Sequence, residues 1–175
     1  MNLAHLPMWN IFVVSYALTA ALGDVMWRKI PKQYTTAGMI IGIVFNTIHS
    51  GWFGFGSSLA ACVIAFAAGV VLFQLGAMGG GDVKLLVAIG AMLGFSRWLF
   101  AVEVAILFAG AMALVQAIRT GRLRQTLANM VDLMRWIFSK GIREHPVVKV
   151  SNAAMLRAPF GVAAAVGTVW AVIRP

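Results

Sequence analysis

Acidic side chains, cysteine and charge of either sign are all scarce in this sequence of 175 residues. Only 11% of the residues are charged, whereas a water-soluble domain carries about 25%. Because 61% of the residues are hydrophobic, the composition excludes an ordinary water-soluble domain. It predicts an integral membrane protein with one membrane-embedded domain over residues 1–175. The single cysteine, Cys62, excludes an internal disulfide and a multi-cysteine metal site.

The formal net charge of +9 would suggest a nucleic-acid partner in a soluble protein. Here the basic residues cluster in loops, which is typical of membrane topology and of contact with anionic lipid, so we expect lipid and no nucleic acid. No Lys or Arg precedes the first apolar run, so we expect this run to be kept as a membrane helix. The three histidines lie far apart in the chain, and we expect no metal or other cofactor.

Apolar runs separated by glycine, proline and charged residues predict an all-α fold with about six transmembrane helices. Turns are expected at residues 49–56 and at Ser96–Arg97, and Pro31 prevents a helix from continuing through the first loop. The short fourth run, residues 85–95, is either a full crossing or a half-helix. The predicted spans are residues 8–23, 35–48, 57–75, 85–95, 98–118 and 158–173.

Residues 119–157 are polar and basic, but they carry apolar side chains at helical spacing, from Leu123 and Leu127 to Met130 and Met134. This pattern predicts an amphipathic cytoplasmic helix that lies in the plane of the lipid headgroups. The alternative is a helix that packs on the loops of the protein.

Six spans would distribute the 14 Lys and Arg residues unequally between the two sides of the membrane. One side receives only Arg97 and Arg174, so the other side is predicted to be cytoplasmic, with both termini outside. Asp24 and Asp82 then share the cytoplasmic face. The cytoplasmic side carries Arg28, Lys29, Lys32, Lys84, Arg119, Arg122, Arg124, Arg135, Lys140, Arg143, Lys149 and Arg157.

The stretch Gly79–Lys84, with the sequence GGGDVK, places three glycines and an acid between apolar runs. By itself this pattern also fits a flexible turn with a solvated aspartate. A second acid, Asp24, follows the first apolar run, and the chain has only five acidic residues in all. A carboxylate at a membrane boundary needs a function or a partner, so the two positions predict a paired-carboxylate site.

Two neighbouring carboxylates are expected to share one proton, because like charges close together do not both ionise easily. The ionised member can take a proton from water, and the protonated member can polarise a peptide carbonyl and then protonate the leaving amine. The glycines at 79, 80 and 81 would let a substrate backbone approach closely and would let Asp82 enter from a non-helical turn.

The residues Gly79–Asp82 resemble the GxGD signature of membrane aspartic proteases, and Gly79–Leu86 resembles the prepilin peptidases, or type IV leader peptidases, more closely. Asp24–Pro31, with the sequence DVMWRKIP, is similar to the first motif of that family. The resemblance implies that Asp24 and Asp82 are catalytic. It also implies cleavage of prepilin-like or pseudopilin precursors after the glycine of a short basic leader, at the cytoplasmic face of the inner membrane.

The chain is similar to the short members of this family, which are the peptidases of tight-adherence (Flp-type) pili and the archaeal preflagellin peptidases, because we expect no cysteine-bearing insert for methyltransferase activity. Of the two, we favour the bacterial pilus form. Lys32 departs from the family pattern, in which Asn commonly follows Ile-Pro. The resemblance also implies contact with pilus-assembly machinery.

Two basic residues near the motifs have alternative interpretations. Lys84 either supports the Asp82 site and binds substrate or extends its amine to the membrane surface, and Arg28 either contacts substrate or sets topology.

Two other function classes also fit paired acids: a small proton-coupled transporter, and a non-catalytic assembly factor for a pilus or secretion machine. Transporter sites usually lie near the bilayer midplane, often within repeated halves, and this sequence shows neither feature.

Overall fold

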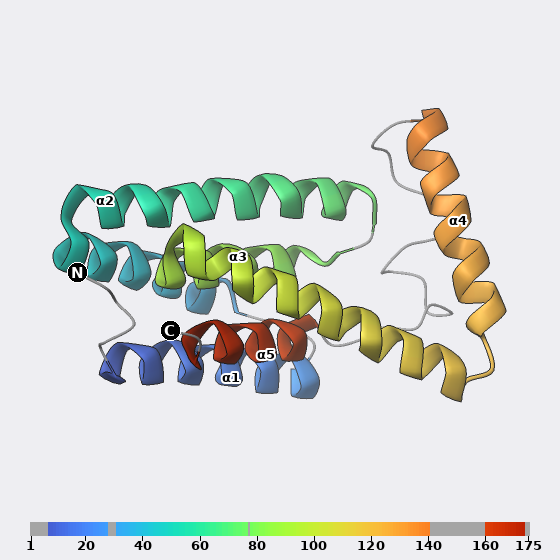
Figure 1. Ribbon diagram of the computed structural model, residues 1–175, viewed down its shortest axis with the longest axis horizontal. Helices are drawn as coiled ribbons and strands as arrows, with labels where there is room; N and C mark the ends of the chain where they lie inside the picture. Colours follow the sequence, from blue (N-terminus) through green and yellow to red (C-terminus); the bar gives the residue numbers. More distant parts are fainter. Residues whose placement is uncertain (1–6, 28–30, 77, 141–159, 174–175) are drawn as a thin grey trace.

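The computed structural model describes residues 7–27, 31–76, 78–140 and 160–173, and these form helices joined by short turns (Figure 1). No strand occurs within these ranges. The described part of the chain is therefore all-α, as predicted. The five helices are α1 (Pro7–Trp27), α2 (Lys32–Gln74), α3 (Gly80–Arg119), α4 (Leu123–Lys140) and α5 (Phe160–Ile173).

The two longest helices each fold back on themselves at one glycine (Figure 1). Gly51 in α2 has φ 58° and Gly94 in α3 has φ 72°, a left-handed conformation that glycine adopts without the clash of a Cβ atom. The turn predicted over residues 49–56 is thus formed at one residue, Gly51, and the rest of that range is helical. The turn predicted at Ser96–Arg97 is wrong, because both residues are helical and the chain reverses earlier, at Gly94.

Three helices are long and apolar enough to cross a bilayer: residues 8–26 of α1, α2, and α3. A straight helix of 43 residues, the length of α2, would extend about 65 Å. The hydrocarbon core measures roughly 30 Å, so each half of α2 has a length suited to one crossing. The helix α5 is apolar but has only 14 residues. Six crossings remain a prediction, and the predicted placement of the termini concerns residues outside the described ranges.

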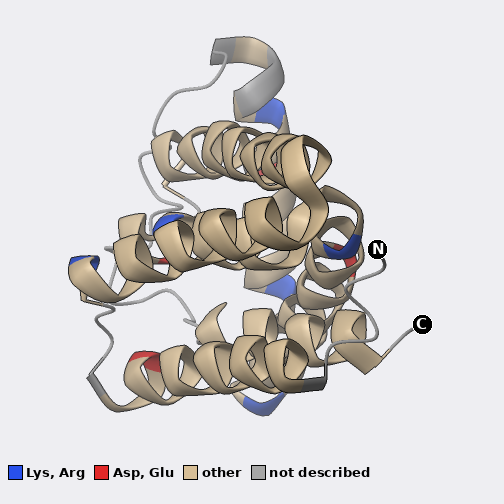
Figure 2. Cartoon of the chain, turned by 90° about the vertical axis from the view of Figure 1, so that its left-hand side faces the viewer, with Lys and Arg blue, Asp and Glu red and all other residues tan. Residues whose placement is uncertain are grey.

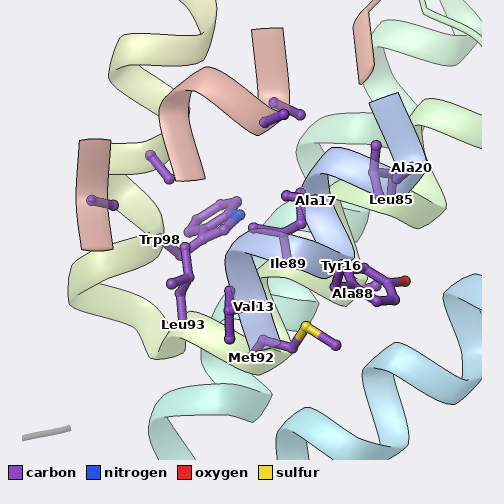
Figure 3. Packing of buried hydrophobic residues seen from close by; sticks show 14 of the residues in the cluster. Val13, Tyr16, Ala17, Ala20, Leu85, Ala88, Ile89, Met92, Leu93 and Trp98 are labelled. Atoms are coloured by element: carbon purple, nitrogen blue, oxygen red, sulfur yellow. The ribbon is translucent and has the colours of Figure 1, made fainter. Parts of the chain in front are cut away.

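The core lies where α1 meets the first half of α3 (Figure 3). The buried residues of α1 recur at helical spacing, so one face of this helix contacts the protein along its whole length. The first half of α3 is buried on most sides, and α3 as a whole contacts α1, α2 and α5. Buried core residues of these two segments include Val13, Tyr16, Ala17, Ala20, Leu85, Ala88, Ile89, Met92 and Leu93.

The helix α4 extends away from the other helices (Figure 1). It occupies residues 123–140 of the predicted amphipathic segment 119–157, and residues 141–157 lie outside the described ranges. Its apolar side chains are open to the surroundings, with Met130 and Met134 each 58% exposed. Elsewhere charged residues are few along the helices (Figure 2), in keeping with a membrane protein.

Candidate active site

Asp24 lies in the last turns of α1 and continues the buried face of that helix. Ala17, Ala20 and Ala21 precede it by seven, four and three residues, so all four side chains share one side of α1. This side faces the protein, and Asp24 is partly buried there. One of its carboxylate oxygens, Oδ2, accepts a hydrogen bond of 2.8 Å from the backbone N–H of Gly161 in α5.

Asp82 lies in the first turn of α3, at the third helical position after the N-cap residue Gly79. Its Oδ2 atom accepts a hydrogen bond of 3.3 Å from the N–H of Gly79, an interaction that stabilises the start of a helix. The expectation that Asp82 enters from a non-helical turn is wrong. Gly79 is extended (φ −77°, ψ 149°), and the helix begins at Gly80. The negative charge of Asp82 in the first turn favours this helix start.

The structure brings the two aspartates together at one end of the helical bundle, although they belong to different helices. Asp24 and Asp82 lie close enough for the charge of Asp24 to act on Asp82. Each Oδ2 accepts a backbone N–H, and neither Oδ1 has a hydrogen bond within the described residues. Two carboxylates whose charges act on each other can share one proton.

The glycines beside Asp82 leave space around the acid. A Cβ atom added at Gly81 would meet no atom within 4 Å, and one added at Gly80 would meet only the ring of Phe73, at 3.7 Å. The side chain of Lys84 is exposed, so it does not pack into the site. Arg28, the other predicted supporting residue, lies outside the described ranges.

Two supporting contacts have no counterpart in the sequence motifs. Tyr16 and Tyr34 exchange hydrogen bonds, since each hydroxyl donates to the main-chain oxygen of the other residue, at 3.1 and 2.7 Å. These bonds join the middle of α1 to the first turn of α2. Gly161 contacts Asp24 directly, but it lies 137 residues away in the sequence, so no local pattern indicated it.

The fold and the site together define a class: an all-helical membrane protein with one carboxylate near the end of α1 and another at the start of α3. A family model described as the type IV leader peptidase family matches residues 11–114, which include both aspartates. The chain belongs to this family, and the family implies a protease. No curated protein and no solved structure matches the chain significantly. Gly161 lies beyond the matched residues.

Proposed function

We propose that this protein is an aspartic endopeptidase that removes the short basic leader from type IV prepilin-like precursors. The observation that carries the proposal is the pairing of Asp24 with Asp82 at one end of the bundle, in a chain of the leader peptidase family. Two carboxylates that share a proton can hydrolyse a peptide bond without a further group.

In the proposed reaction the ionised aspartate accepts a proton from a water molecule that the two carboxylates bind. The oxygen of this water attacks the scissile carbonyl carbon, while the protonated aspartate donates its proton to the carbonyl oxygen. When the tetrahedral intermediate collapses, the C–N bond breaks and the leaving nitrogen takes a proton from the pair. The open space beside Gly80 and Gly81 suits the approach of an extended substrate backbone.

The proposed substrates are prepilin or pseudopilin precursors, and the proposed location is the inner membrane with the active site facing the cytoplasm. Of the 14 Lys and Arg residues, 12 fall on the side of Asp24 and Asp82 if the chain crosses the membrane six times, and such a bias is typical of the cytoplasmic side. Pilus-assembly machinery is the proposed setting in which the processed subunits are used.

We also propose that α4 lies on the cytoplasmic surface of the membrane. Its exposed apolar residues Leu127, Met130 and Met134 share one side of the helix. Arg124 and Arg135 flank this side, where they can reach anionic headgroups. Because only Thr120–Arg122 separate α3 from α4, the helix starts at the membrane boundary. A basic substrate leader would be repelled by the same charges, which favours lipid as the contact.

The transporter and the assembly factor are less well supported. Membership in a peptidase family favours hydrolysis over either of them.

The experiment that tests the proposed function is cleavage of a prepilin-type peptide by the purified full-length protein in detergent micelles. The peptide carries a short basic leader that ends in glycine, followed by an apolar segment. Mass spectrometry should find one new C-terminus, at the leader glycine. A matched peptide with that glycine replaced by valine serves as the control and should remain uncut. Cleavage of both peptides at the same rate, or of neither, would overturn the proposed specificity.

A further inference from the structure

The first turn of α5 contacts α1 through the carboxylate of Asp24. Gly161 is the second residue of α5, and the N–H groups of a first helical turn have no partner within their own helix. The Gly161 N–H donates to Asp24 Oδ2 at 2.8 Å. Hydrogen bonds to a carboxylate are stronger than neutral ones, and the positive end of the helix dipole adds to the attraction.

The approach of the two helices at this point is too close for a side chain at position 161. A Cβ atom added to Gly161 would lie 2.9 Å from the Cβ of Asp24, 3.0 Å from its Oδ2 and 3.2 Å from the Cα of Ala21. The Ala21 atom belongs to the backbone, so it cannot rotate away. A residue larger than glycine must therefore turn the Asp24 side chain or separate α5 from α1.

The rest of α5 leaves little freedom for such a separation. Ala163, Ala164 and Ala165 follow Gly161 and are all nearly fully buried. Alanine side chains are short, so the helices pack at close range and a shift at one end disturbs the contacts along α5. The least disruptive response to a side chain at 161 is a change in the orientation of the Asp24 carboxylate.

The two carboxylates are held in different ways. Asp82 is fixed by the N-cap of its own helix, through the 3.3 Å bond from Gly79. Asp24 lies near the end of α1, and within the described residues its one hydrogen bond comes from α5. Correct alignment of the pair therefore depends on where α5 begins.

We propose that Gly161 is a positioning residue, whose N–H directs the Asp24 carboxylate toward Asp82 and the reacting water. The proposal rests on the proposed peptidase function. It assigns a role in the reaction to the last helix of the chain, which contributes no acidic or basic side chain within its described residues. Gly161 itself does not touch the substrate in this account.

The test is steady-state cleavage of the prepilin-type peptide by Gly161→Ala in detergent micelles, with folding checked by size-exclusion chromatography and thermal unfolding. We expect kcat to fall by about a hundredfold, because a displacement of about 1 Å in a catalytic group has an effect of this size. The KM should stay within about twofold, because the substrate-facing glycines are unchanged. Gly110→Ala is the matched control, since an added Cβ there meets no atom within 4 Å.

A second variant separates the hydrogen bond from the effect of the added methyl group and applies even if Gly161→Ala fails to fold. Replacement of Gly161 by glycolate, introduced by nonsense suppression, converts its N–H to an ester oxygen and adds no atom. We expect kcat to fall again at an unchanged KM. If the wild-type protein cleaves the peptide and the ester variant has the same kcat, the proposal is wrong. If the wild type itself cuts no prepilin peptide, the proposed function is wrong instead.

Discussion

Asn46 is a buried amide within an apolar helix, and the break in α3 at Gly94 explains its position. In a regular helix the N–H of Phe95 would bond the carbonyl of Ala91, but here it donates to Ser57 Oγ at 2.9 Å. The Ala91 carbonyl instead accepts from Asn46 Nδ2 at 2.8 Å and from Ser58 Oγ at 2.9 Å. Polar side chains thus satisfy the backbone groups that the break leaves without a helical partner.

We predict that Asn46→Leu destabilises the protein by about 1 kcal/mol, because the Ala91 carbonyl loses the Asn46 amide and keeps the Ser58 hydroxyl as a donor. The measurement is thermal or denaturant unfolding in detergent. Thr47→Ala is the control, since the Thr47 hydroxyl donates to the carbonyl of Ile43, within its own helix. Equal stability of the two variants would mean that Asn46 does not support the break.

The sequence predicts the two aspartates as a pair, because each lies in a short motif beside an apolar run. It was not sufficient to predict the roles of Asn46 and Gly161. Asn46 bonds a carbonyl 45 residues away, and Gly161 bonds a carboxylate 137 residues away. Such contacts depend on how helices pack, and small or amide residues in apolar runs carry no periodic signal.

At the scale of helices, the predicted spans were close to the observed segments, because apolar length is a strong signal in a membrane protein. The turns were less predictable. Arg97 was expected in a turn because it is charged, yet it is helical, and its guanidinium donates to the side-chain oxygen of Asn10 at 3.2 and 3.3 Å. Gly94 reverses the chain instead, because its backbone adopts a positive φ.

For α4 we predict contact with anionic lipid along its apolar side. In a Cys62→Ala background, nitroxide labels are placed at Met130→Cys, on the apolar side, and at Gln125→Cys, on the opposite side. The full-length protein is reconstituted in vesicles of phosphatidylcholine and phosphatidylglycerol. The label at 130 should be more accessible to oxygen, which partitions into lipid, than to a water-soluble nickel complex, and the label at 125 should show the reverse.

The control for this prediction is a vesicle of phosphatidylcholine alone. The difference in accessibility between positions 130 and 125 should be smaller there, because the basic residues have no anionic headgroups to attract them. If both labels prefer the water-soluble nickel complex in anionic vesicles, α4 does not lie on the membrane.

At the scale of the whole molecule, the end of α1 and the start of α3, which carry the aspartates, lie at one end of the bundle, and the reversals within α2 and α3 lie at the other (Figure 1). The charge distribution predicts that the aspartate end faces the cytoplasm. Only the structure could show that the two acids lie near each other, because two helix ends can share a membrane face and still lie far apart.

We predict that a cysteine near Gly51 is reached from outside the cell membrane and a cysteine at the start of α2 is not. In a Cys62→Ala background, Phe53→Cys should react with an impermeant maleimide in intact spheroplasts. Gln33→Cys should react only after the membrane is permeabilised. Both native side chains are exposed, so burial does not limit either reaction, and the opposite pattern would contradict the proposed orientation.

The central claim is that Asp24 and Asp82 act together on a water molecule. The most direct measurement is the rate of prepilin-peptide cleavage by Asp24→Asn and Asp82→Asn, with Asp132→Asn on the exposed surface of α4 as the matched control. The account predicts that both active-site variants fold and lose at least about a hundredfold in kcat, while the control keeps the wild-type rate. Wild-type cleavage by either active-site variant would show that this aspartate is not catalytic and would contradict the account.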